Sequence, residues 1–138
     1  MIPNGNRTST NSNGRQVIVA RTPNEKKKAL LKWCQIKTRE YGNKIELTNF
    51  STSWADGLAF CALVHHFFKD AFDFDKLRSE NVAENCTLAF KIAEERANIS
   101  PLLDVEDMVK MWPKPDYKCI FTYVQCMYDK LKEFDKPK

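Results

Sequence analysis

The sequence has few of the features that catalytic, metal-binding or membrane-spanning proteins require. It holds two histidines, His65 and His66, and none of its five cysteines forms a C-x-x-C pair. Adjacent residues on a helix point about 100° apart, so the two histidines cannot converge on one zinc ion. No apolar run approaches the roughly 20 residues of a membrane span. We therefore expect no enzymatic activity, no metal site and no cofactor.

The sequence also lacks a secretion signal, because no basic region followed by an apolar stretch opens the chain. An odd number of cysteines fits buried thiols better than disulfides, so we expect a cytoplasmic protein in a reducing compartment. Four Asn-x-Ser/Thr triplets begin at Asn6, Asn49, Asn85 and Asn98. Without secretion they have no access to glycosylation machinery, and we interpret them as chance.

Charge is divided unevenly along the chain. Residues 1–44 have a net charge of +8 and residues 45–138 a net charge of −4, which together make the total of +4. This asymmetry predicts an acidic partner for one end of the molecule, such as a filament or an anionic lipid surface. Nucleic acid is not expected, since no exposed aromatic platform or recognisable motif accompanies the basic residues.

The longest apolar stretch predicts a central helix from Ser53 to Phe68. From Trp54 onward only Asp56, His65 and His66 are polar, so the helix should be packed on several sides. Ser53 and Asp56 have the spacing of a short capping box. Gly57 is costly inside a helix and indicates that a neighbouring backbone comes close there. His65 lies on the apolar stripe and is interpreted as a hydrogen-bonded core histidine.

The other elements follow from helical periodicity. Residues 1–22 are polar and predict a disordered tail, apart from a β-prone stretch at 16–20, and residues 136–138 predict a second tail. A helix is expected from Pro23 to Tyr41, with Gly42 as its stop. Residues 82–97 predict a third helix and Asp104 starts a short one. Asp116 is expected to cap the last helix. With an ordered loop at 69–81 and no long alternating pattern, the class is all-α, in one domain spanning residues 23–135.

Trp112 lies between the short helix and the last one, in the run Trp112-Pro113-Lys114-Pro115. The two prolines predict an extended break. The tryptophan is interpreted as a plug of the bundle end, with an exposed anchor for a protein partner as the alternative.

Several motifs agree in order and spacing with one known family. ALLKWCQIKT, FSTSWADGLAFCALVHHFF, AFDFDKL, ENCTLAFKIAEE, DVEDMV and KPDYKCIFTYVQCMYDKL together resemble a calponin-homology domain over about residues 26–133. The resemblance is closest to the single domains of smoothelin and smoothelin-like proteins, with the cytospins next. It implies a compact bundle of four main helices plus short ones. The family's structural motif falls on eight residues: Trp33, Trp54, Asp56, Gly57, Leu58, His65, Pro115 and Asp116.

The resemblance implies a non-enzymatic binding module of the actin cytoskeleton. Because the chain resembles the second or single type of domain, it implies weak or indirect binding to actin filaments or actin-associated proteins, with tropomyosin as one candidate. The alternative is a signalling or membrane adaptor that binds calmodulin or anionic phosphoinositides. The C-terminal MYDKLKEFDKPK mixes acids with lysines and is a poor calmodulin-binding pattern. A monomer is expected. The candidate partner-binding residues are Lys26, Lys27, Lys28, Lys32, Trp112 and Lys114.

Overall fold

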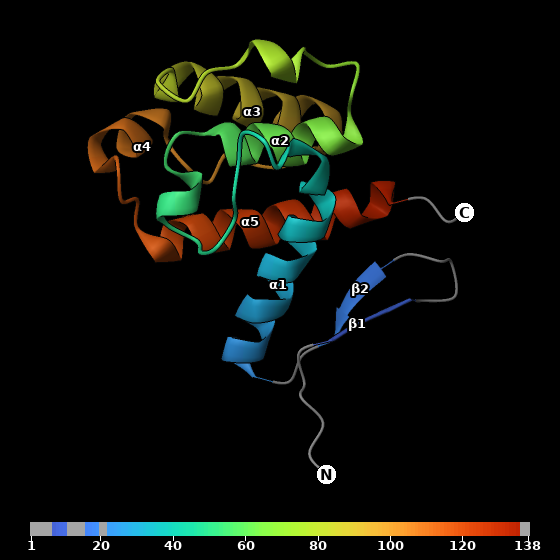
Figure 1. Cartoon of the computed structure of the whole chain (residues 1–138). Helices are drawn as coiled ribbons and strands as arrows, with labels where there is room; N and C mark the ends of the chain where they lie inside the picture. The colour runs from blue at the N-terminus through green and yellow to red at the C-terminus, as the bar shows by residue number, and fades with distance from the viewer. Residues whose placement is uncertain (1–6, 11–15, 20–21, 136–138) are drawn as a thin grey trace.

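The computed structural model of the chain describes residues 7–10, 16–19 and 22–135 (Figure 1). The folded body contains five helices: α1 (Pro23–Lys37), α2 (Leu58–Phe67), α3 (Val82–Ala97), α4 (Val105–Met111) and α5 (Tyr117–Leu131). Four 3₁₀ turns join or extend them, at Arg39–Tyr41, Thr52–Trp54, Phe74–Lys76 and Lys132–Phe134. The all-α fold, with four main helices and one short one, is confirmed for this body.

Two short strands precede the helices. β1 (Arg7–Thr10) pairs antiparallel with β2 (Gln16–Val19), with Arg7 opposite Val19 and Thr10 opposite Gln16. β2 lies beside α1. A two-stranded hairpin is marginal by itself, so this neighbour matters for its stability. Residues 16–19 of the β-prone stretch therefore form a strand, whereas its pairing with β1 is not predicted. The other residues of the expected tails, 1–6, 11–15, 20–21 and 136–138, lie outside the described residues.

The core is organised around α2, as the sequence predicts. Every residue from Leu58 to Val64 is buried, and α3 makes the most extensive contact with this helix. The ring of Phe60 lies 5.3 Å from that of Phe90 on α3 and 5.6 Å from that of Tyr123 on α5, measured between centroids. α2 therefore lies between α3 and α5 (Figure 1). Aromatic edges meeting faces at such distances add to the stabilisation from burial.

The predicted start of this central helix is wrong. Ser53 and Trp54 belong to a 3₁₀ turn, and α2 begins only at Leu58, after Gly57 with a φ of 83°. The hydroxyl of Ser53 accepts a hydrogen bond from the Thr48 amide at 3.0 Å instead of capping the helix. Asp56 does act at the helix start, since its carboxylate accepts from the Leu58 amide at 2.9 Å.

A close contact at Gly57 explains why α2 begins only at Leu58. A Cβ built on this glycine would lie 2.8 Å from Asn85 Cβ, 2.9 Å from Cys86 Sγ and 3.0 Å from the Cys86 nitrogen. Such distances leave no room for a side chain. The prediction that a neighbouring backbone approaches Gly57 is confirmed, and the left-handed φ is a second reason for glycine at this position.

The remaining boundaries mostly agree with the sequence. α3, α4 and α5 occupy the predicted stretches, with Asp104 and Asp116 as N-caps. α1 starts at Pro23 as predicted but ends at Lys37, where Thr38 donates its hydroxyl proton to the Cys34 carbonyl at 2.7 Å. A 3₁₀ turn then carries the chain to residue 41. Gly42 has an ordinary φ of −60°, so it does not end a helix by adopting a left-handed conformation.

The prediction that the cysteines are buried thiols holds for three of the five. Cys34, Cys61 and Cys86 are buried, whereas Cys119 is exposed and Cys126 is half-buried. Desolvation raises the pKa of the Cys86 thiol to about 12, so this sulfur stays protonated. In the described part of the chain, no helix has the length and hydrophobicity to cross a bilayer.

The contact at Gly57 yields a stability prediction. Gly57→Ala should lower the free energy of unfolding by about 2–4 kcal/mol, because alanine is strained at positive φ and its methyl group would overlap α3. Urea denaturation measures this loss. Gly42→Ala is the matched control, since its Cβ would lie 3.4 Å from the Arg39 carbonyl at an ordinary φ, and should stay within about 1 kcal/mol of wild type. Equal stability of the two variants would contradict the assigned role of Gly57.

Candidate functional site

The four candidate lysines of the first helix lie within the first ten residues of α1, which is firmly capped. Thr22 accepts a hydrogen bond from the Glu25 amide at 3.1 Å, and the Glu25 carboxylate accepts from the Thr22 amide at 3.0 Å. This reciprocal pair is a capping box, which fixes the first turn. Lys26, Lys28 and Lys32 are exposed beyond it, and Lys28 and Lys32 lie one turn apart. We call these three residues the lysine face; Lys28 and Lys32 share one side of α1, and Lys26 lies on another side, in the exposed first turn.

Lys27 does not belong to the lysine face. Its Nζ lies 4.4 Å from the centre of the Tyr117 ring, at the start of α5. A cation over an aromatic face is attracted by the ring quadrupole, so this lysine helps join α1 to α5. The sequence interpretation treats the four lysines as one cluster, and the structure separates them into three exposed charges and one packed charge.

Trp112 is exposed, so its interpretation as a plug is wrong. Its side chain is 55% accessible on the turn between α4 and α5, where Lys114 is also exposed. Pro115 is buried at this end of the bundle instead, and its carbonyl accepts a hydrogen bond from the Ser51 hydroxyl at 2.6 Å. No hydrogen bond, ion pair or ring contact among the described residues joins Trp112 or Lys114 to the lysine face. The candidate partner-binding residues therefore lie on two elements, α1 and the turn between α4 and α5.

The eight motif residues serve the fold. Trp33, Trp54 and Leu58 are buried in the core, and the Trp54 indole donates to the Asn49 carbonyl at 2.7 Å. Burial raises the pKa of the Asp56 carboxyl. The hydrogen bond from the Leu58 amide lowers this pKa, but its effect is smaller than that of burial. Asp116 accepts from the Lys118 amide at 3.3 Å and so caps α5.

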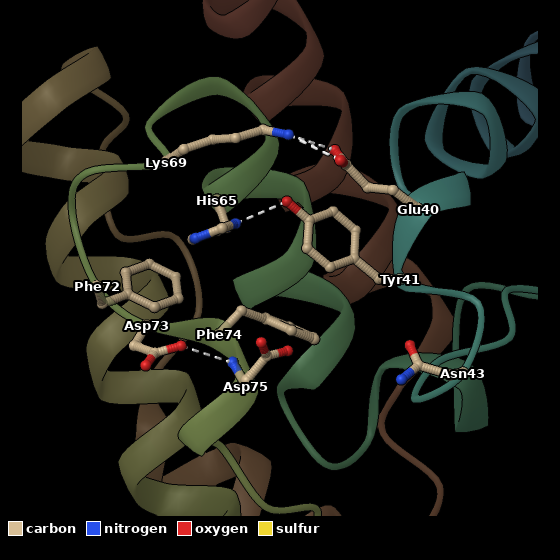
Figure 2. A pocket seen from close by; sticks show the side chains of 9 residues that line it. All are labelled: Glu40, Tyr41, Asn43, His65, Lys69, Phe72, Asp73, Phe74 and Asp75. Carbon is tan, nitrogen blue, oxygen red and sulfur yellow. Dashed lines mark hydrogen bonds and ion pairs between the residues drawn. The ribbon is translucent and has the colours of Figure 1, made fainter.

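His65 lies in a polar hollow of about 390 Å³ between the end of α2, the turn after α1 and the loop at 72–75 (Figure 2). Its Nδ1 is 2.7 Å from the hydroxyl of Tyr41, and burial raises the pKa of that hydroxyl. Beside it, Glu40 binds Lys69 at 2.7 Å and His66 at 3.1 Å. The hydrogen bond from Lys69 is the main reason why the pKa of the Glu40 carboxyl is lowered.

This hollow links three segments of the chain. Tyr41 and Glu40 follow α1, His65 and His66 end α2, and Lys69 begins the next loop, so each bond joins distant parts of the chain. The interpretation of His65 as a hydrogen-bonded histidine is confirmed, although it is half-buried rather than enclosed. Among the described residues, no group of three or more ligating side chains could hold a metal ion.

Comparison with protein families matches residues 24–133 to the calponin homology (CH) domain. That span includes the five helices except for Pro23, the first residue of α1, together with the Gly57 contact and every candidate residue. The chain belongs to the calponin homology family. Human smoothelin-like protein 1 is 48% identical to this CH domain over 105 residues, which is 76% of this chain and 21% of the relative. Mouse alpha-actinin-3 is 49% identical over 102 residues, which is 74% of this chain and 11% of the relative.

These relatives confirm the resemblance to smoothelin-like proteins and add alpha-actinin, which the sequence motifs alone do not indicate. The chain spans about a fifth or less of the length of these curated relatives. The comparisons therefore concern the CH domain and not a whole protein of that size.

The contrast between two tryptophans of the CH domain is testable. Trp54 is 0% exposed, so Trp54→Ala should cost about 3–5 kcal/mol of stability, as expected for truncating a buried aromatic side chain. Trp112→Ala should cost less than about 1 kcal/mol, because most of that ring is already in water. Thermal or urea unfolding of both variants measures the difference. A loss at Trp112 equal to that at Trp54 would show that Trp112 is part of the core.

Proposed function

We propose that this CH domain is a non-enzymatic binding module of the actin cytoskeleton, which contacts an acidic surface through the lysine face. Family membership and the smoothelin-like and alpha-actinin relatives support an actin-associated module. The observation that carries the proposal is the lysine face itself. Lys26, Lys28 and Lys32 are exposed on a capped helix that buried residues such as Trp33 anchor to the core.

Rigid presentation favours binding through charge. A helix that is already ordered loses little conformational entropy on contact, so even weak electrostatic attraction contributes to affinity. Surface charges act mainly through the summed field and are screened by salt. We therefore expect weak, salt-sensitive binding to an acidic filament, and a cytoplasmic, cytoskeleton-associated location.

The same lysines would also attract anionic phosphoinositides. Binding to such lipids is the alternative function, and vesicle binding distinguishes it from binding to filaments. The structure gives less support to calmodulin. Met127, Tyr128 and Leu131, the apolar face that a calmodulin target would have to offer, are buried in the core. Lys132 lies 3.9 Å from Asp129, and Lys37 binds Asp135 at 2.7 Å, so acids also accompany the basic residues of this end.

The test is co-sedimentation with actin filaments, with and without tropomyosin, at several salt concentrations. Changing Lys26, Lys28 and Lys32 to Glu should weaken binding about tenfold or more at low salt, because three charges of the lysine face are reversed. Lys27 stays unchanged, since its reversal would break the contact with Tyr117. The matched control reverses three exposed lysines elsewhere, namely Lys91, Lys110 and Lys130.

The proposal is contradicted if both triple variants lose the same affinity, or if neither does. Binding to phosphoinositide vesicles without binding to filaments, lost only in the lysine-face variant, would favour the membrane adaptor instead. Circular dichroism spectra of all variants must match, so that lost binding reports on charge and not on folding.

A further inference from the structure

A second exposed surface differs from the lysine face in its chemistry. Three of the large hydrophobic side chains in the described part of the chain, Leu102, Val109 and Trp112, are 54%, 47% and 55% exposed. All lie on or beside α4. Clustered apolar exposure of this kind marks interaction surfaces more often than scattered single residues do.

These side chains border two hollows along the boundary between α3 and α4. One, of about 500 Å³, is lined by Ser79, Glu80, Val82, Ala83, Val109 and Trp112. The other, of about 430 Å³, includes Thr87, Phe90, Leu102, Asp104, Val105 and Asp107. We call the two hollows together the α3–α4 seam.

The spacing of the lining residues shows that the hollows follow one another. Ala83, Thr87 and Phe90 recur at intervals of four and three along α3, on one face of the helix. Val105, Val109 and Trp112 recur at the same intervals along α4 and the residue after it. The start of α3 meets the end of α4, and the middle of α3 meets its start. The seam therefore runs along about 10 Å of helix, or two turns.

The charge of the seam is negative. Glu80, Asp104 and Asp107 line the hollows, and no lysine or arginine does. Asp104 accepts a hydrogen bond from the Glu106 amide at 2.9 Å but, like Asp107, has no ion-pair partner among the described residues. Glu80 lies 3.8 Å from Arg78, and both side chains are largely in water, so this pair neutralises little.

We propose that the α3–α4 seam is a docking surface for a basic amphipathic helix of a protein partner. Apolar side chains at i, i+3 or i+4, and i+7 of such a helix would match two turns of groove, and its lysines or arginines would meet Glu80, Asp104 and Asp107. This interaction is separate from the lysine face, which has the opposite charge, and it goes beyond the proposed function.

Two other occupants fit less well. An anionic membrane would be repelled by the carboxylates of the seam. A second copy would have to offer a basic helix with free apolar anchors, but the apolar side of α1, including Leu30, Trp33 and Cys34, is buried in its own core. The charge and the spacing together therefore favour a separate basic helix.

Trp112 provides a direct signal for the test. It is one of three tryptophans, and the other two, Trp33 and Trp54, are 1% and 0% exposed. The probe is a synthetic helix of about 14 residues, with leucines at i, i+3, i+4 and i+7 and lysines elsewhere. Titration into the full chain should shift Trp112 fluorescence to the blue with saturation, and added salt should weaken the affinity. A twin peptide with glutamates in place of lysines should give no saturable shift.

Two pairs of charge reversals locate the site. Glu80→Lys with Asp107→Lys should weaken peptide affinity about tenfold, because two acids of the seam become basic. Glu94→Lys with Glu95→Lys changes the net charge equally at exposed positions that line neither hollow, and should leave the affinity unchanged. Leu102→Ser with Val109→Ser should also weaken binding while circular dichroism shows an intact fold.

Four results would overturn the proposal: no saturable shift with the basic peptide, equal binding of the acidic twin, equal loss in both charge-reversal pairs, or no effect of the two serine substitutions. Burial of Trp112 on concentrating the protein alone, with dimers in analytical ultracentrifugation, would assign the seam to a second copy. A blue shift of Trp112 with anionic vesicles but not with the peptide would assign it to a membrane. Either outcome would also overturn the proposal.

Discussion

The rest of the structure depends on the close contact between the start of α2 and α3 at Gly57. The missing side chain lets α3 approach the backbone, and Asn85 uses that position to donate two hydrogen bonds, to the Asp56 carbonyl at 2.9 Å and the Arg78 carbonyl at 2.8 Å. Asn85 is 1% exposed, and backbone carbonyls buried without donors would be costly. One amide group therefore ties the central helix, its packing partner and the intervening loop together.

Periodicity in the sequence predicts the long helices well, because α3 and α5 each bury one face, and α5 also has Asp116 as its N-cap. It predicts the start of α2 wrongly, because the local pattern of Ser53 and Asp56 competes with a tertiary contact that no local pattern records. The asparagines show the same limit. Asn49 accepts hydrogen bonds from two backbone amides, Asn85 donates the two hydrogen bonds at Gly57, and Asn98 has a φ of 58° after α3. No local pattern in the sequence indicates these roles.

The candidate site is predictable only where it depends on a single helix. The exposed positions of Lys28 and Lys32 follow from helical spacing, since Trp33 and its apolar neighbours define the inner side of α1. Lys26 is seven residues before Trp33, on that same side, and is exposed because the buried residues of α1 begin only at Ala29. The separate role of Lys27 depends on Tyr117, about ninety residues later in the chain, and it could not be found without the packing of α1 on α5. The two-proline break correctly marks an end of the bundle, but not which residue is buried there.

α4 exposes apolar residues because only a small part of this helix packs into the core. α4 has seven residues and only Met108 among them is buried, while its first turn is held by the Asp104 cap. α1 is the opposite case, because its apolar side is buried and only charge remains for a partner. In Figure 1, α1 lies below the other helices and α4 at the upper left. Electrostatic attraction alone suffices for weak contact at α1, whereas α4 still has apolar surface to bury, so a tighter and more selective contact is better placed there.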